Sequence, residues 1–436
     1  MEPALELEHA IGYSTVCGII CWHPNGKKFL YAAGASVVIS DLVDPHDQIF
    51  LRGHDAPVTC LTLSASGRLA ASGQNGANSD ACVWDYEAKQ LLYRLSEHDH
   101  GVACLAFSHD EKLLCTCGVA ADNKALVWDM SNGYIVAVVQ ATPSPTTCVC
   151  WGGFVRDIKR RDTANYQLCT AGNKQVVLWN LDPFQGELEA RKVVSEGRGA
   201  QVRDYTHLAF SDDLETVYAA TTSGDFVIIR VKSASFTGTV PVSRQGIHAL
   251  AAHRGGLLVG GGDGTVTHLE GQTMHETHQV ELRGPVVAMS FSPDKIEVMV
   301  GTADGFIYRL RTETLQSLLV CENHSAGLVK VGFSKDASDR FATLSMDCTV
   351  RVWDAADYST LASVTVRDAG TPACLTYTLD YLLTGWSDGK IRAHEAETGH
   401  FLWHIDNAHT GGGVTAICLS NNERSRAVHT KKPSSP

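Results

Sequence analysis

Four segments of this chain end in the same pattern, which recurs along most of its length. Each has two or three mostly apolar residues, then tryptophan, then aspartate or asparagine, and the segments span residues 81–85, 125–129, 176–180 and 350–354. Degenerate copies extend the series, so that the tryptophan position falls at Ser40, Trp84, Trp128, Trp179, Ile229, Leu269, Leu310, Trp353 and His394. These positions lie about 40 to about 51 residues apart, a period that indicates an array of similar units packed against one another.

The period and its residues resemble the WD40 repeat, with Gly53-His54 at the start of one unit and Trp84-Asp85 at its end. The resemblance predicts an all-β fold, a WD40 β-propeller built from four-stranded antiparallel blades. Neighbouring blades cover both faces of each blade, so small and β-branched side chains are expected on the inner strands.

Counting the units predicts one complete seven-bladed ring followed by an incomplete second propeller. We expect the ring at residues 1–322, and two blades plus the first strand of a third at 323–420. Residues 421–436 are polar, basic and without period, which predicts a disordered basic tail. The incomplete ring suggests a truncated form of a longer two-propeller protein; a partner that supplies the missing blades is the less favoured explanation.

Composition narrows the possible functions. The net charge of −12 disfavours nucleic acid as a partner, because phosphate binding needs a basic surface. No stretch of about 18 apolar residues is present, and residues 1–8 lack an apolar signal core, so neither membrane nor secretion is expected. The 14 cysteines form no Cys-x-x-Cys pair, and we interpret most of them as small core residues in a reducing compartment.

In WD40 proteins a histidine, a serine or threonine, a turn aspartate and the tryptophan form a hydrogen-bonded chain. All four positions match at His324, Thr343, Asp347 and Trp353, whereas the unit of Trp84 matches three and has Asn78 at the aspartate position. The other blades lack most members. The predicted structural blade residues are His54, Ser72, Trp84, Asp122, Trp128, Trp179, His324, Thr343, Asp347, Trp353 and Asp388.

Motifs that could carry catalysis have structural explanations. Residues 260–264 are rich in glycine but lack the Lys-Ser/Thr of a phosphate loop, which favours a hairpin turn. His275 and His278 have the wrong spacing for a helical zinc motif. We therefore expect no enzyme activity, no catalytic residue, no metal, no cofactor and no small-molecule substrate.

A basic cluster interrupts the fourth unit. Arg156, Lys159, Arg160 and Arg161 provide four cations within six positions of an otherwise acidic chain. The simpler interpretation is a solvated loop. The functional interpretation is a partner-binding loop that holds an acidic surface through short-range ion pairs.

Several stretches outside the Trp-Asp signatures resemble the cilia- and flagella-associated protein 52 family, over nearly the whole chain up to about residue 417. They include residues 5–12, 70–74, 256–260, 385–393 and 407–417. The resemblance implies two tandem propellers and a microtubule inner protein of motile cilia, located in the B-tubule lumen near the inner junction.

The leading hypothesis is therefore a non-catalytic scaffold of ciliary and flagellar doublet microtubules, located in the axoneme, that contacts tubulin and other inner-junction proteins. The alternative is a soluble cytosolic WD40 adaptor, such as a ubiquitin-ligase substrate receptor.

Overall fold

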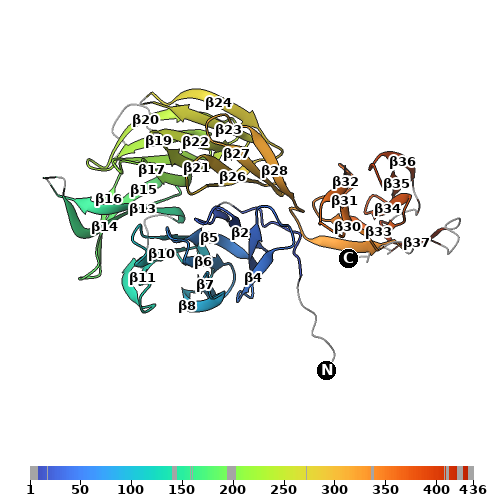
Figure 1. Ribbon diagram of the computed structural model, residues 1–436, viewed down its shortest axis with the longest axis horizontal. Coiled ribbons are helices and arrows are strands. Elements are labelled where there is room, and N and C mark those ends of the chain that lie inside the picture. Colours follow the sequence, from blue (N-terminus) through green and yellow to red (C-terminus); the bar gives the residue numbers. More distant parts are fainter. Residues whose placement is uncertain are drawn as a thin grey trace. The chain divides into compact units, whose positions relative to one another are not determined.

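The computed structural model describes residues 8–16, 18–139, 145–157, 159, 161–193, 203–271, 273–334, 338–406, 408, 412–419 and 426–430, the last five by their backbone alone. All regular elements in this part of the chain are β-strands, so the predicted all-β class is confirmed. In the same part, no helix is long and apolar enough to cross a membrane. The chain divides into two compact units, residues 1–321 and 322–436, which we describe separately (Figure 1).

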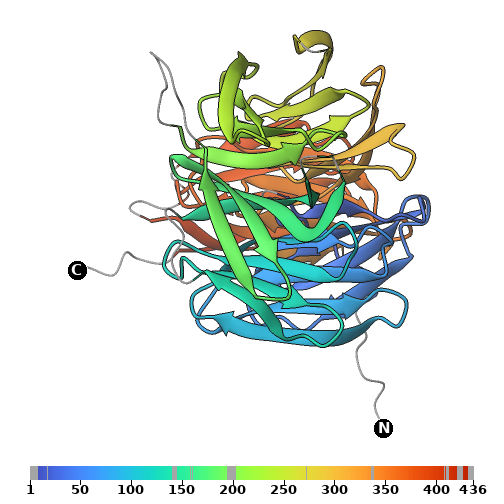
Figure 2. The ribbon, with the colours of Figure 1, turned by 90° about the vertical axis from the view of Figure 1, so that its left-hand side faces the viewer.

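In the described residues of the first unit, the strands form seven four-stranded antiparallel sheets, each made of four consecutive strands. Their colours can be followed from blue to orange in Figure 2. Numbered as blades one to seven, the sheets are β1 (Ile20–Trp22), β2 (Lys28–Ala33), β3 (Ser36–Asp41) and β4 (Gln48–Arg52); β5 (Val58–Leu63), β6 (Leu69–Gln74), β7 (Ser79–Asp85) and β8 (Gln90–His98); β9 (Val102–Phe107), β10 (Leu113–Gly118), β11 (Ala125–Asp129) and β12 (Ile135–Val139); β13 (Thr146–Arg156), β14 (Asp162–Gly172), β15 (Gln175–Asp182) and β16 (Glu187–Lys192); β17 (Tyr205–Phe210), β18 (Thr216–Thr221), β19 (Asp225–Arg230) and β20 (Ser235–Pro241); β21 (Ile247–His253), β22 (Gly256–Gly261), β23 (Thr265–Glu270) and β24 (His275–Glu281); β25 (Val286–Phe291), β26 (Glu297–Thr302), β27 (Phe306–Arg311) and β28 (Ser317–Glu322).

Adjacent blades pack through the first strand of one blade and the second strand of the blade before it. Val102 of β9 lies over Gly73 of β6, and Val286 of β25 lies over Gly260 of β22, so that a Cβ atom on either glycine would overlap the valine. The second strands β6, β10 and β22 are buried along their whole length, as a strand with both faces covered should be. This explains why their sequences consist almost entirely of apolar and small residues, chiefly Leu, Gly, Ala and Cys.

The first and last blades of this unit meet, which closes the seven sheets into a ring. Strand β1 packs beside β25 and β26. The Gly18 amide donates to the Val287 carbonyl at 3.1 Å, and the Trp22 amide donates to the Ser290 hydroxyl at 2.8 Å. Tyr13 and Ile20 fill the space above Gly301 of β26, where a Cβ atom would overlap both side chains.

The part of the second unit that the structure describes has two four-stranded sheets, blades eight and nine, and a strand pair. They are β29 (Leu328–Phe333), β30 (Arg340–Ser345), β31 (Thr349–Asp354) and β32 (Thr360–Thr365); β33 (Pro372–Tyr377), β34 (Tyr381–Trp386), β35 (Ile391–Glu395) and β36 (Phe401–Ile405); and the pair β37 (Val414–Leu419) with β38 (Arg426–Thr430).

The prediction of a disordered tail is wrong for residues 426–430. They form β38, which pairs antiparallel with β37. The backbone N–H and C=O groups of these polar residues therefore bond to another strand instead of to water. Residues 421–425 and 431–436 of that predicted tail lie outside the described residues.

The ring closure can be tested with a single methyl group. Gly301→Ala places a Cβ against Tyr13 and Ile20, and overpacking of a tight core should lower the free energy of unfolding of the first unit by about 1–3 kcal/mol. Gly238→Ala is the matched control, because a Cβ added at that position on the outer strand β20 would meet nothing within 4 Å. Urea unfolding of both variants measures the difference in unfolding free energy. Equal stabilities would contradict tight packing between the first and last blades.

Candidate functional site

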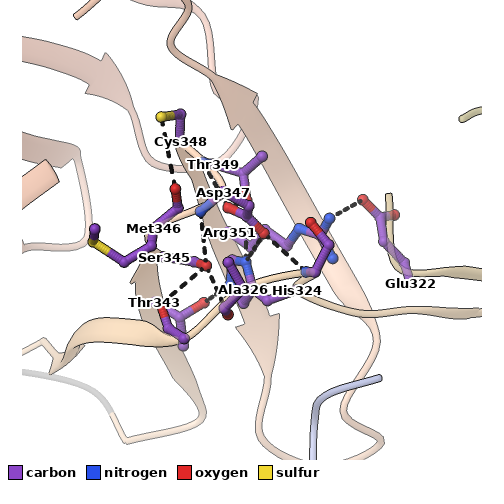
Figure 3. A network of polar contacts seen from close by, with 12 residues as sticks. Glu322, His324, Ala326, Thr343, Ser345, Met346, Asp347, Cys348, Thr349 and Arg351 are labelled. Carbon is purple, nitrogen blue, oxygen red and sulfur yellow. Dashed lines mark hydrogen bonds and ion pairs between the residues drawn. The ribbon is translucent and has the colours of Figure 1, made fainter. Parts of the chain in front are cut away.

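A chain of hydrogen bonds crosses blade eight and joins its first loop to its third strand (Figure 3). The Trp353 indole donates to the Thr343 hydroxyl at 2.7 Å, and that hydroxyl lies 2.7 Å from His324 Nε2. His324 Nδ1 lies 2.9 Å from the Asp347 carboxylate. With the ring proton on Nδ1, every donor in this chain faces an acceptor.

Asp347 is the charged end of this network. Burial would raise the pKa of its carboxyl, but hydrogen bonds from His324 and Thr349 outweigh burial and hold the pKa well below its ordinary value. The same carboxylate accepts the Ser325 and Thr349 amides, at 3.1 and 2.8 Å. It is therefore an ionised anchor for two loops.

Arg351 extends the polar cluster on the same strand. Its side chain is 2% exposed and lies over the Trp353 ring at 5.9 Å. Its Nη2 atom lies 3.8 Å from a Glu322 oxygen, and Figure 3 shows the two side chains facing each other. A buried guanidinium needs such a counter-charge, so the Glu322 carboxylate compensates for the burial of the Arg351 charge.

Blade two has a shorter version of the chain. His54 Nε2 and the Trp84 indole both contact the Ser72 hydroxyl, at 2.7 and 3.0 Å. The aspartate position is filled differently from the prediction: the Gln74 side-chain oxygen, 2.7 Å from His54 Nδ1, takes the role expected of Asn78. Asn78 instead lies in a turn with positive φ, a conformation that asparagine tolerates.

Blade three contains a network that the sequence analysis missed. His98 Nε2 and the Trp128 indole contact the Thr116 hydroxyl at 2.9 and 3.0 Å, and His98 Nδ1 lies 3.4 Å from Asp122. The expectation that the blades beyond the two matched ones lack most members is therefore wrong for this blade. His98 was missed because glutamate, rather than the usual glycine, precedes it. Its spacing could have revealed it, since His98 stands eighteen residues before Thr116, as His54 stands eighteen residues before Ser72.

The remaining predicted blade residues also form internal contacts. Trp179 donates to Thr170 at 2.8 Å. Asp388 holds Arg392 through both carboxylate oxygens, at 3.3 and 2.5 Å, while the nearby Trp386 donates to Thr384 at 2.9 Å. All of these polar groups bond to neighbours within their own blade, which is the behaviour of structural residues.

The basic cluster lies at the tip of a long hairpin. Strands β13 and β14 have eleven residues each, longer than their counterparts in the other blades. The hairpin is braced at its base, where Trp151 donates to the Ala106 carbonyl at 2.8 Å and the Tyr166 hydroxyl donates to Asp110 at 2.7 Å. Phe154 packs edge-on against His109 with ring centroids 4.4 Å apart.

At the tip, two of the four predicted cations are paired within the hairpin. Arg156 Nε lies 3.3 Å from Asp162, and Arg161 lies 2.9 Å from Asp157. Lys159 is exposed, and Arg160 lies outside the described residues. These ion pairs shape the turn and reduce its positive charge, so the loop is less basic than its sequence suggests.

Cys60 and Cys148 are buried on first strands, and burial raises the pKa of the Cys60 thiol to about 12. A buried protonated thiol is a poor nucleophile. Within the described residues, no group of three or more His, Cys, Asp or Glu side chains is arranged to hold a metal ion.

The blades and their tryptophan networks define a WD40-repeat β-propeller protein. The WD40 family (WD domain, G-beta repeat) matches residues 47–85, 89–129 and 315–354. Cilia- and flagella-associated protein 52 of Chlamydomonas reinhardtii is 31% identical over 431 residues, covering 96% of this chain and 67% of the relative. The human protein of that name is 29% identical with the same coverage, and mouse WD repeat-containing protein 90 is 24% identical, covering 97% of this chain and 24% of its own length. The chain belongs to the cilia- and flagella-associated protein 52 family.

Removing one hydroxyl tests the blade-eight network. Thr343→Val leaves the Trp353 indole and His324 Nε2 without their shared partner, which should cost about 1–3 kcal/mol of unfolding free energy in the second unit. Thr365→Val on the exposed side of β32 is the control and should change stability by less than about 0.5 kcal/mol. Thermal unfolding measures both; a Thr343→Val variant as stable as the control would show that the network contributes little.

The histidine networks predict a loss of stability in mild acid. Burial lowers the pKa of His98 although Asp122 opposes the shift, so below about pH 6.5 the unfolded chain binds a proton that the folded chain resists. We therefore expect the melting temperature to fall between pH 7.5 and 5.5. His98→Gln should make this dependence less steep while His275→Gln, at an exposed histidine, should not; identical pH profiles for the two variants would contradict this explanation.

Proposed function

We propose that this protein is a non-catalytic structural scaffold of cilia or flagella. The observation that carries the proposal is the 31% identity to an algal cilia- and flagella-associated protein across 96% of the chain. The structure supports a binding role, because the polar residues of the blades bond to one another. A rigid ring holds its connecting loops in fixed positions, and such loops can bind several partners at once.

We further propose that the protein lies inside ciliary doublet microtubules, near the inner junction of the B-tubule, with tubulin and other junction proteins as partners. This location is what membership of the family implies. An acidic scaffold with net charge −12 would bind the acidic tubulin surface through shape and local basic groups rather than through overall attraction.

The β13–β14 hairpin is the part of the first unit that we propose as a local contact for such a partner. Its base is fixed by aromatic packing and hydrogen bonds, so its tip is presented without a large ordering cost on binding. Lys159 supplies an exposed cation at the turn, and the pairs of Arg156 and Arg161 hold the turn in shape.

Fractionation of axonemes tests the location. A protein inside the doublet should remain with purified doublets after a salt wash that removes proteins from the outer surface. Quantitative mass spectrometry of the washed doublets and of the wash measures this. Recovery of the whole protein in the soluble membrane-plus-matrix fraction would contradict the proposal.

A charge reversal tests the hairpin. Lys159→Glu should weaken binding to doublets lacking the endogenous protein several-fold, because it places a carboxylate against an acidic surface. Lys27→Glu reverses the charge of another exposed lysine, in blade one, and serves as the control. Co-sedimentation with doublets measures binding; equal loss in both variants would point to overall charge instead of a local contact.

A further inference from the structure

Thr163 is an exposed residue near the tip of the β13–β14 hairpin, at the start of β14. Arg160 and Arg161 precede it by three and two residues, and the sequence contains no other Arg-Arg pair. Protein kinases that select basic substrates bind arginines at these two positions through acidic pockets, beside the hydroxyl that accepts the phosphate. The sequence around Thr163 therefore has the form of a phosphorylation site.

The contacts of the Thr163 hydroxyl leave it open to reaction. The hydroxyl donates to the Val155 carbonyl on the facing strand at 2.7 Å, and it accepts the Asn165 amide at 3.3 Å, which is long for a hydrogen bond. Both contacts are between exposed groups of the same hairpin. Only one good hydrogen bond, which water can replace, is lost when this oxygen reacts.

The backbone around Thr163 is loosely paired. The ladder between β13 and β14 shifts register twice between Trp151 and Arg156, so residues 163–165 have no ladder partner among the described residues of β13. A segment released from the ladder can enter a kinase cleft in extended form without unpairing the rest of the sheet. The aromatic contact of Phe154 meanwhile holds the base of the hairpin in place.

The recognition side chain next to Thr163 is also accessible. The Arg161 side chain is 71% exposed and forms its ion pair with Asp157 inside the same turn. An exposed ion pair of this kind contributes little to stability, so its guanidinium can exchange Asp157 for a carboxylate of a kinase. Sequence, exposure and pairing thus agree on the same hydroxyl.

We propose that Thr163 is phosphorylated by an arginine-directed protein kinase and that the phosphate neutralises the hairpin tip. The Thr163 oxygen forms a bond to the γ-phosphorus of ATP, the bond from that phosphorus to the leaving ADP breaks, and the hydroxyl proton passes to a carboxylate of the kinase. The neutralising effect rests on the proposed function, in which the tip contacts an acidic partner.

The charge of the tip determines what the phosphate changes. Within residues 156–162, four lysines and arginines against two aspartates leave a formal charge of +2. A phosphate on threonine carries about −1.5 to −2 at neutral pH, which cancels nearly all of that charge. The phosphorylated tip therefore offers almost no net positive charge to an acidic surface.

Other hydroxyls preceded by arginine match the pattern less well. Ser233, in the turn between β19 and β20, is exposed and has Arg230 three residues before it, but Val231 stands where Thr163 has its second arginine. Thr312 also follows an arginine by three residues, yet it is 0% exposed. Thr163 combines both arginines with an exposed hydroxyl.

The phosphorylation site is tested on the purified 436-residue chain with ATP and the catalytic subunit of cyclic-AMP-dependent protein kinase, an arginine-directed enzyme. Tandem mass spectrometry should locate a phosphate on Thr163, and Thr163→Val should remove it. Arg161→Gln should slow transfer to Thr163 about tenfold, because a charge-assisted contact with the kinase is lost. Its melting temperature should not change, since the side chain is largely exposed.

Arg230→Gln is the matched control, because it removes an exposed arginine that precedes a different hydroxyl, Ser233, by three residues. Transfer to Thr163 should proceed at the unaltered rate in this variant. Absence of phosphate from Thr163 in the folded chain would overturn the proposed site. Equal rates at Thr163 in Arg161→Gln and Arg230→Gln would do the same.

The effect of the phosphate on binding is measured by co-sedimentation with doublets that lack the endogenous protein. The phosphorylated chain should bind several-fold more weakly than the unmodified chain, and a phosphatase should restore binding. Thr163→Val treated with the same kinase should bind like the unmodified chain. Equal binding with and without phosphate on Thr163 would overturn the neutralising role. Failure of the unmodified chain to bind would instead contradict the proposed function, while the kinase assay, which contains no doublets, decides the phosphorylation site by itself.

Discussion

The packing of one blade's first strand on the second strand of the blade before it is the contact on which the whole structure depends. A large residue such as Val102 or Val286 fills a hollow that exists only because glycine stands at position 73 or 260. Hydroxyls reinforce the contact between neighbouring blades: Thr59 donates to the Val102 carbonyl at 2.6 Å, and Thr147 donates to the Tyr205 carbonyl at 2.8 Å. Repeated around the first unit, this contact produces a ring whose blades hold the connecting loops in place.

That architecture determines what the polar residues can do. His98, Thr116 and Asp122 resemble a catalytic constellation in composition, yet they are buried and bond to one another and to the Trp128 indole. Their role is to connect loop to strand within one blade. The braced β13–β14 hairpin points outward from its blade, and it is the surface that we propose as a contact for a binding partner.

Much of the fold could be predicted because the repeat returns tryptophan, a hydroxyl residue and a turn aspartate in the same order with similar spacing along the chain. The chain of Trp353, Thr343, His324 and Asp347 could be predicted for the same reason. What failed depends on contacts that spacing does not encode. Gln74 replaces Asn78 because its longer side chain reaches His54 from the second strand.

The charge at the tip of the β13–β14 hairpin and the structure of residues 426–430 also depend on contacts that residue spacing does not encode. Asp157 and Asp162 neutralise part of a cluster that looks strongly basic when its cations are counted alone. Arg426–Thr430 form a strand because β37 offers a pairing edge, although their polar surroundings suggested disorder. Arg156 finds Asp162 at the start of the next strand, Arg161 finds Asp157 within the same turn, and β38 finds β37.

Hydrogen exchange where the first and last blades meet is the most direct test of the central claim, that seven blades close into a ring. The amides of Gly18 and Trp22 bond to Val287 and Ser290 across the meeting point of the first and last blades. If the ring is closed, both amides should exchange as slowly as those of the buried strand β22. Exchange at the rate of an unstructured peptide, with β22 still protected, would show that the ring is open and would contradict the account.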